Sequence, residues 1–409
     1  MHTLLATTGA SPQVVTETLY AIHHSNGQWP DEIYIITTSF GKDKAVKGLL
    51  EQGHLQRLCQ QLNRPQPAFS ADHILETPGA DGAAVEDARS LADHEALANF
   101  IMTQVRDRTR RPADSLHASL AGGRKTMTFY LGYAMSLFGR AQDSLSHVLV
   151  SDGYESVPSF WFPTAEEGHR HIETRTATLD ANAAQVTLAP IPFVRHRRDL
   201  PPVLLQERDA VNFAQLVQLI NLGENPQLLR VCVDLPNKCI KLHAADSDLC
   251  LTFELGLLEL AFYTLMARST VEHETDLNRP SSTKKDRGIA LSLLEELMPI
   301  CNLSSENQID KNLEKLSNTD GDNQAQLSTR TLDSLKNGMS DTWFDSRKNK
   351  ISALFAQQLP ISLVRWITPS AIWEKNGTPL IQDHTERTPQ GCGYGIALQP
   401  EQISIVDIG

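Results

Sequence analysis

Strand-like and helix-like segments alternate over the first half of the chain, and this alternation restricts the fold more than any other feature. Apolar, strand-like runs occur at residues 2–8, 32–39, 73–78, 116–122 and 145–152. Segments with apolar residues at helical spacing lie between them, at residues 12–25, 42–63, 91–109 and 124–140. Repeated strand–helix–strand units place their strands parallel in one sheet and their helices on both faces. We therefore predict an α/β fold with a parallel sheet for this half.

The second half of the chain differs in character. It follows a basic, proline-bearing stretch at residues 195–202, which we interpret as a domain boundary. We predict one domain over residues 1–195 and a second, smaller domain over residues 196–409. Residues 302–331 are rich in Asn, Ser, Asp and Gln, so we expect much of this segment to be a mobile insertion or linker.

Shorter elements are expected beyond the first five strands. Strand-like stretches lie at residues 159–164, 184–197, 228–235, 238–244, 363–373 and 393–398, helical ones at 207–223, 249–268 and 345–359, and a turn at Asn376-Gly377. The mixture of strands and helices after residue 196 predicts an α+β domain.

Charge and cysteine pattern limit the classes of function. The net charge of -12 argues against a general nucleic-acid coat, because such binding depends on neutralising phosphates, but it leaves room for a local basic pocket. The six cysteines include no CxxC pair, so we expect reduced thiols, no metal and no cofactor. No apolar run reaches the roughly 20 residues of a membrane helix, and no secretory signal is visible, so we expect a cytoplasmic protein.

Small residues and hydroxyls stand where strands turn into helices. The stretches are TTGASP (residues 7–12), TTSFGKDK (37–44) and SLAGGRKTM (119–127). Ligands of an open parallel sheet sit beyond the carboxyl ends of its strands, where helix N-termini present free N–H groups to anions. We therefore predict a phosphate-type site there, with these candidate residues: Thr8, Gly9, Ala10, Ser11, Ser39, Lys42, Gly122, Gly123, Arg124, Lys125 and Thr126.

Two familiar phosphate motifs are absent from these stretches. TTGASP and SLAGGRKTM contain neither the GxxxxGK[ST] of a Walker A loop nor the GxGxxG of dinucleotide-binding proteins. Nucleotide hydrolysis and dinucleotide redox chemistry therefore lack their usual signal. A purely structural interpretation stays open at this point. Glycines are common at strand-to-helix turns, and Lys125 could be a solvated lysine at the start of a helix.

Two of the stretches together carry a resemblance to a known family. LLATTGASPQVVTETLYAI (residues 4–22) with SLAGGRKTM resembles the CRISPR-associated Rossmann-fold (CARF) family, and in particular its ring nucleases, over roughly residues 1–195. The resemblance implies a Rossmann-like fold and a homodimer that binds a cyclic oligoadenylate, most plausibly cyclic tetra-adenylate, at its two-fold axis. It also implies cleavage of that messenger, which would end the type III CRISPR signal.

The resemblance assigns roles to two residues. Ser11 corresponds to the family's catalytic-loop serine and Lys125 to its phosphate-contacting lysine. Cleavage then needs no metal, because a ribose 2′-OH held in line can attack its own 3′-phosphate while cations stabilise the developing charge. We expect Ser11 to hydrogen-bond the scissile phosphate or the 2′-OH, and Lys125 to stabilise charge.

The second half resembles a winged-helix domain in part. Residues 249–268 are similar to the opening LTxxExxLLxxLA helix, 345–359 lie where a recognition helix would be, and 393–398 resemble a wing strand. Arg347, Lys348 and Lys350 would then contact DNA. They could equally form the solvated face of an amphipathic helix, and a winged helix could serve for dimerisation alone.

Two alternative functions stay open from the sequence. The chain could be a sensor that binds the cyclic ligand without cutting it and regulates DNA through the second domain. Alternatively, Arg268 and His273 fit the R-x4-H pattern of HEPN ribonucleases, which would make the chain a ligand-activated ribonuclease. HEPN domains are all-helical, whereas this half contains strand-like stretches.

Overall fold

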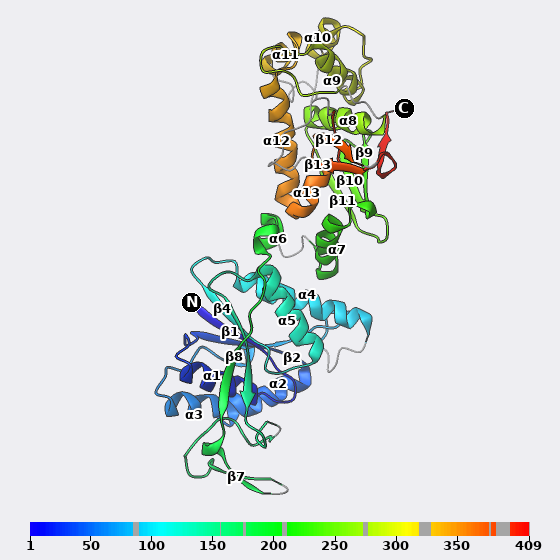
Figure 1. Cartoon of the computed structure of the whole chain (residues 1–409). Helices are drawn as coiled ribbons and strands as arrows, with labels where there is room; N and C mark the ends of the chain where they lie inside the picture. The colour runs from blue at the N-terminus through cyan, green and yellow to red at the C-terminus, as the bar shows by residue number, and fades with distance from the viewer. Residues whose placement is uncertain are drawn as a thin grey trace. The chain divides into compact units, whose positions relative to one another are not determined.

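A computed structural model provides the structure of the chain, which forms two compact units (Figure 1). It describes residues 1–84, 90–155, 157–174, 177–206, 211–272, 277–318, 329–375, 378–381 and 393–408. The first unit comprises Met1–Leu200 and Leu204–Ala214, and the second comprises Pro201–Val203 and Gln215–Gly409. No helix within these ranges has the length and apolar character to cross a membrane.

A six-stranded sheet forms the centre of the first unit, in the order β3-β2-β1-β4-β5-β8. Its strands are β1 (His2–Thr7), β2 (Glu32–Thr37), β3 (Ile74–Glu76), β4 (Ser115–Ser119), β5 (Ser144–Val150) and β8 (Val186–Pro190). The first five are parallel, and β8 pairs antiparallel with β5. The predicted α/β fold is therefore confirmed, with a sheet that is parallel except for the antiparallel edge strand β8.

Helices cover both faces of this sheet (Figure 1). They are α1 (Gln13–His24), α2 (Ser39–Ala45), a π-helix (Val46–Glu51), α3 (His54–Gln61), α4 (Leu91–Arg108) and α5 (Lys125–Phe138). All six residues of β1 are buried, as expected for a central strand with helices above and below. Leu4 and Ala6 of β1 pack in one apolar cluster with residues of α1 and α3.

The helix expected over residues 42–63 is wrong as a single element. It consists of α2, the π-helix and α3, and the break before α3 falls at Gly53, whose φ is 68°. A left-handed residue ends one helix and starts another, and glycine adopts it without steric cost.

A small subdomain separates β5 from β8. It contains the hairpin of β6 (His171–Glu173) and β7 (Thr178–Asp180) and its own apolar cluster, formed by Phe160, Ile172, Ala181 and Ala184. The strand expected at residues 159–164 is wrong, because Trp161 packs against the π-helix and α3, and Phe160 packs in the apolar cluster of this segment. Of the stretch at 184–197, residues 186–190 form β8.

The described residues of the second unit form two sheets. The first, in the order β11-β10-β9-β15, has β9 (Leu229–Asp234), β10 (Cys239–Ala244), β11 (Cys250–Glu254) and β15 (Ile403–Val406). The second, in the order β13-β12-β14, has β12 (Ser370–Lys375), β13 (Thr378–Ile381) and β14 (Tyr394–Gly395). The strands expected at 228–235 and 238–244 are confirmed as β9 and β10. The turn expected at Asn376-Gly377 lies outside the described residues.

Helices make up much of the described part of the second half. They are α6 (Pro202–Gln206), α7 (Phe213–Glu224), α8 (Leu257–Val271), α9 (Arg287–Ile300), α10 (Ile309–Ser317), α11 (Thr329–Lys336), α12 (Asp341–Gln358) and α13 (Ile361–Ile367). The helices expected at 207–223 and 345–359 correspond to α7 and α12, although residues 207–210 lie outside the described ranges.

Three expectations for this half need correction. Residues 250–254 are strand β11 instead of helix, because the alternating sequence CLTFE pairs with β10 and Gly256 then caps α8. Residues 361–367 are helix α13 instead of strand, since Leu363, Val364 and Ile367 lie on one buried side. The polar segment is not wholly a linker: α10 buries Ile309, Leu313 and Leu316 at helical spacing.

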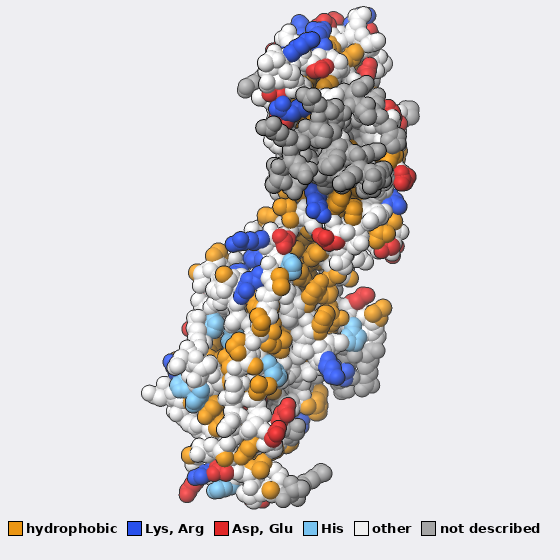
Figure 2. Space-filling view, in the orientation of Figure 1, with side chains coloured by type: hydrophobic (Ala, Val, Ile, Leu, Met, Phe, Trp, Pro, Cys, Tyr) orange, Lys and Arg blue, Asp and Glu red, His pale blue; other side chains and the backbone are white. Residues whose placement is uncertain are grey.

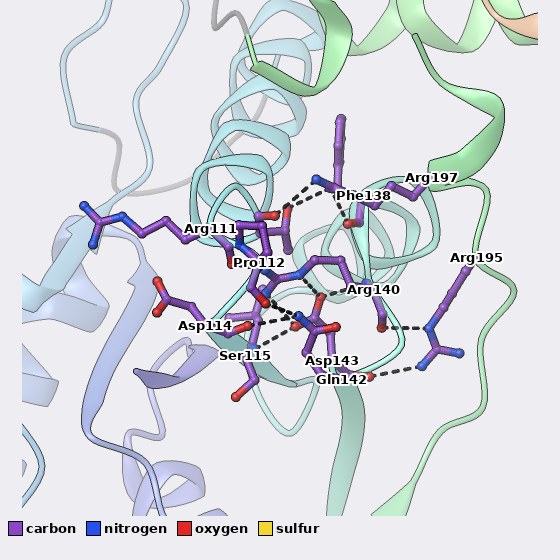
Figure 3. Close-up of polar contacts among 12 residues, drawn as sticks. Arg111, Pro112, Asp114, Ser115, Phe138, Arg140, Gln142, Asp143, Arg195 and Arg197 are labelled. Carbon is purple, nitrogen blue, oxygen red and sulfur yellow. Dashed lines mark hydrogen bonds and ion pairs between the residues drawn. The ribbon is translucent and has the colours of Figure 1, made fainter. Parts of the chain in front are cut away.

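A buried carboxylate holds the amino ends of β4 and β5 together (Figure 3). Asp143 accepts hydrogen bonds from the Leu116 amide at 2.8 Å and from Nε and Nη2 of Arg140, each at 2.8 Å. Its side chain is fully buried. Arg195 donates to the carbonyl oxygens of Arg140 and Asp143, so the basic stretch that follows β8 is attached to the same corner.

We predict that Asp143→Ala lowers the free energy of unfolding by about 3–5 kcal/mol. The substitution leaves a poorly solvated guanidinium and a buried amide without their acceptor. Urea unfolding followed by circular dichroism measures the change. Asp152→Ala removes an exposed carboxylate that follows β5 and serves as the control. Equal effects of the two substitutions would contradict this role for Asp143.

Candidate functional site

Three loops meet at the carboxyl edge of the sheet in the first unit. They follow β1 (residues 8–12), β2 (residue 38) and β4 (residues 120–124), and these strands are neighbours in the order β2-β1-β4. Because the strands are parallel, the loops and the starts of α1, α2 and α5 lie at one edge. The structure therefore brings the three predicted stretches together.

Backbone contact between two of these loops leaves no room for side chains. The hydroxyl of Thr7 donates to the carbonyl oxygen of Gly122 at 2.7 Å. A Cβ atom on Gly122 would lie 3.0 Å from Cγ2 of Val14 and 3.2 Å from the carbonyl oxygen of Thr7, and Gly123 has a φ of 95°. These positions require glycine, one for close approach and one for its left-handed backbone.

The segment that follows β2 packs equally tightly against the loop that follows β1. A Cβ atom on Gly41 would lie 1.9 Å from Oγ1 of Thr37 and 2.8 Å from the carbonyl oxygen of Gly9. The amide of Thr8 also donates to the carbonyl oxygen of Ile36 at 3.0 Å. The start of α2 is therefore seated directly against the loop that follows β1.

Two helix N-termini at this edge lack a side-chain cap. Pro12 precedes α1 and Arg124 precedes α5, and neither side chain accepts a hydrogen bond from the first turn. The N–H groups of those first turns are available to an anionic ligand. In contrast, Thr38 caps α2 through a hydrogen bond from the amide of Gly41.

The candidate residues differ in how they are presented. Ala10, Ser11, Gly123, Arg124 and Lys125 are exposed, and Gly9, Ser39, Lys42, Gly122 and Thr126 are partly buried. The side chains of Ser11 and Lys125 form no hydrogen bond or ion pair with any described residue. Both are free to contact a ligand, and they sit on loops that touch through Gly9 and Gly123, where a Cβ on Gly9 would be 3.6 Å from Cα of Gly123.

Two candidate residues are less accessible to a ligand than the sequence indicated. The ammonium group of Lys42 forms an ion pair with Glu76 at 2.8 Å, so a ligand phosphate would have to compete with that carboxylate. Thr8 is fully buried, and its hydroxyl has no hydrogen-bond partner among the described residues.

Sequence reasoning missed two residues near this edge. Phe40, in the first turn of α2, is 52% exposed, and Nζ of Lys44 lies 5.3 Å from the centroid of its ring. An aromatic residue inside a predicted ligand loop was the available signal.

Glu17 of α1 is buried. Burial, and then the charge of Glu155, raise the pKa of its carboxyl group to about 8. A glutamate within an otherwise buried stretch of helix was the signal there.

Comparison with known proteins gives one informative result. The family model described as CRISPR-associated protein NE0113 matches residues 11–221, just over half of the chain. The match begins at Ser11 and includes α1, α2 and the loop that carries Arg124 and Lys125. No curated protein matches the chain.

We predict that the contribution of Glu17 to stability falls as pH rises from about 4.5 to about 8. Glu17 is protonated in the folded state up to its raised pKa, whereas it ionises near pH 4.5 when unfolded, so the folded state binds more protons in this window. Ionisation of Glu17 thereby lowers the free energy of unfolding by about 1.4 kcal/mol per pH unit within this window. Urea unfolding at pH 5 and pH 8 measures it, and Glu17→Gln should flatten the difference. An unchanged pH dependence in this variant would refute the assignment.

Proposed function

The chain belongs to the family of CRISPR-associated protein NE0113, and we propose that its first unit binds and cleaves a cyclic oligoadenylate. The observation that carries the proposal is the pairing of Ser11 and Lys125, two exposed and unpartnered side chains on touching loops, beside two uncapped helix N-termini. Hydroxyl, ammonium and N–H groups at such an edge are complementary to phosphates.

Local charge is what permits a polyanion to bind to this acidic chain. The net charge of -12 repels anions at long range, so attraction must come from groups in direct contact with the ligand. Arg124 and Lys125 stand at the start of α5, where the helix dipole adds to their charge. A homodimer would supply two copies of each, which suits a ring of four adenylates with four phosphates.

A homodimer is part of this proposal, and the surface of the first unit supports it. Figure 2 shows apolar side chains gathered on the drawn face of this unit, with few charged ones among them. Phe129, four residues after Lys125, is 64% exposed, and Leu149 on β5 is 53% exposed. A second copy of the chain would cover such apolar surface.

The proposed chemistry uses groups that the ligand and the chain already hold. The ribose 2′-OH attacks the adjacent phosphorus, the bond to the 5′-oxygen breaks, and the products end in a 2′,3′-cyclic phosphate and a 5′-hydroxyl. Ser11 would hold the scissile phosphate or the 2′-OH in line, and Lys125 would stabilise the charge that develops on the phosphoryl oxygens. No cofactor enters this sequence of steps.

The second unit gives less support to the alternative functions. Arg347 and Lys350 of α12 form ion pairs with Glu259 of α8 at 2.6 and 3.5 Å, and Nζ of Lys348 lies 5.9 Å from the ring centroid of Tyr394. These contacts favour a structural role for the three cations over DNA binding. The winged-helix resemblance stays a prediction.

The contacts of Arg268 also give no support to the ribonuclease alternative. Arg268 forms ion pairs with Glu296 at 2.8 Å and with Asp407, so its guanidinium is held by two carboxylates. The second residue of the pattern, His273, lies outside the described residues.

The mechanism predicts cleavage without a metal. Labelled cyclic tri-, tetra- and hexa-adenylate incubated with the full chain in EDTA should give linear products that end in a 2′,3′-cyclic phosphate. Chromatography against synthetic standards identifies them. A strict Mg²⁺ requirement, or products with a 5′-phosphate, would contradict attack by the 2′-OH.

Two substitutions separate binding from cleavage. Lys125→Ala should weaken ring binding and cleavage together, each by roughly 10- to 100-fold, because a charge-assisted contact acts before and during the reaction. Ser11→Ala should slow single-turnover cleavage by at least 10-fold and change the binding affinity less. Lys47→Ala, which removes an exposed lysine of the π-helix, is the matched control.

Other outcomes would favour the alternatives. Tight binding by the wild-type chain with no turnover over hours would make it a sensor. Cutting of linear RNA that requires the cyclic ligand and is lost in His273→Ala would make it a ribonuclease.

A further inference from the structure

A cavity of about 790 Å³ lies in the first unit apart from the strand-edge residues described above. Its walls come from α3, from the irregular segment at residues 158–164 and from β6 with the turn before it. None of the candidate residues of the strand edge lines it. Its volume falls within the range of small-molecule sites in proteins, which runs from about 300 to about 1,000 Å³.

The wall formed by Trp161 depends on a glycine in an unusual helix. A Cβ atom on Gly48 would lie 2.2 Å from Cη2 of the Trp161 indole, so the ring fits only against glycine. Gly48 belongs to the π-helix, a rare geometry that is frequent at functional sites. The indole also stacks on the ring of His54, with the ring centroids 3.8 Å apart and an interplanar angle of 11°.

Arg57 brings a positive charge to this cavity, and the carboxylate that acts on it electrostatically, that of Glu166, lies beyond ion-pair distance. Its Nη1 donates to His169 and its Nη2 donates to Nδ1 of His54. Its Nε is buried and has no hydrogen-bond partner within the described ranges, and no described carboxylate lies within ion-pair distance. The guanidinium therefore donates to two imidazole rings where a paired arginine would donate to a carboxylate.

The neighbouring imidazoles add donors. Burial, and then the charges of Arg57 and His169, lower the pKa of His54 to about 3, so its ring is neutral at pH 7. Since a guanidinium can only donate, Nδ1 of His54 is the acceptor and Nε2 carries the proton. Arg57, His54 and the hydroxyl of Ser159 thus present mainly donors to the space they enclose.

We propose that this cavity is a second binding site, and that its ligand is a small organic phosphate. Arginine is suited to phosphate because its planar fork of donors matches two phosphoryl oxygens. The cavity is much larger than a phosphate ion, which leaves space for the organic part beside Trp161. The carboxylate of Glu173 at the rim is exposed, accepts a hydrogen bond from Thr178 at 2.8 Å and forms no ion pair with Arg57.

The test measures binding of three probes to the full chain. Adenosine 5′-monophosphate, inorganic phosphate and adenosine are titrated by calorimetry, and quenching of tryptophan fluorescence is followed in parallel. We expect the monophosphate to bind more tightly than either inorganic phosphate or adenosine. The fluorescence change should be lost in Trp161→Phe.

Substitutions identify the site. Arg57→Gln should raise the Kd for adenosine 5′-monophosphate by roughly 10- to 100-fold, the effect of losing a charged hydrogen bond. Arg64→Gln, which removes a nearby guanidinium that does not line this cavity, should leave the Kd unchanged. If Arg57→Gln does not fold, His169→Gln at an exposed position provides the second variant, and its Kd should also rise.

Lys125→Ala separates this inference from the proposed function. The cavity should bind the monophosphate as well in Lys125→Ala as in the wild type, whether or not the strand edge cleaves a cyclic ligand. Binding that is lost in Lys125→Ala and kept in Arg57→Gln would place the probe at the strand edge and overturn the proposal. Equal affinity for adenosine and its monophosphate, or no binding of any probe at millimolar concentration, would also overturn it.

Discussion

The close approach of Thr7 to Gly122 and Gly123 is the contact on which the rest of the first unit's edge depends. A hydroxyl-to-carbonyl bond of 2.7 Å joins the end of β1 to the loop after β4, and a side chain on either glycine would separate them. This contact sets where α1 and α5 begin, and so where Ser11 and Lys125 stand. A site made from two loops is precise only when the loops are supported by strands and by each other, as these are.

Local patterns predicted the sheet but not the segments whose structure is set by distant residues. The alternation of apolar runs sufficed for β1 to β5, because buried parallel strands leave a strong signal in sequence. The aromatic stretch at 159–164 looked like a strand, yet Trp161 packs on Gly48, more than a hundred residues earlier. The helix expected over residues 249–268 failed at its start for a different reason, because the alternating residues 250–254 pair with the adjacent strand β10 and the helix begins only at Leu257.

In the candidate site, too, some features could be predicted from local sequence and others depend on distant residues. Glycines and hydroxyls at strand ends indicated which loops would meet, since parallel topology alone brings those loops to one edge. The ion pair of Lys42 with Glu76 joins helix α2 to the end of β3 across 34 residues, and the burial of Thr8 depends on its neighbours in the packed loops. Neither can be inferred from spacing. The cavity beside Arg57 left no motif at all, because its walls come from three segments that are separated in sequence.

Helix α1 physically joins the strand edge to that cavity. The amide nitrogen Nε2 of Gln13, in its first turn, donates to the carbonyl oxygen of Pro158 at 2.6 Å, and the hydroxyl of Thr16 donates to the carbonyl oxygen of Trp161 at 2.8 Å. Ser11 lies two residues before this helix, and Glu17 is buried one residue after Thr16. The first turns of α1 therefore begin at the strand edge and also hold, through two side-chain hydrogen bonds, the segment that carries Trp161.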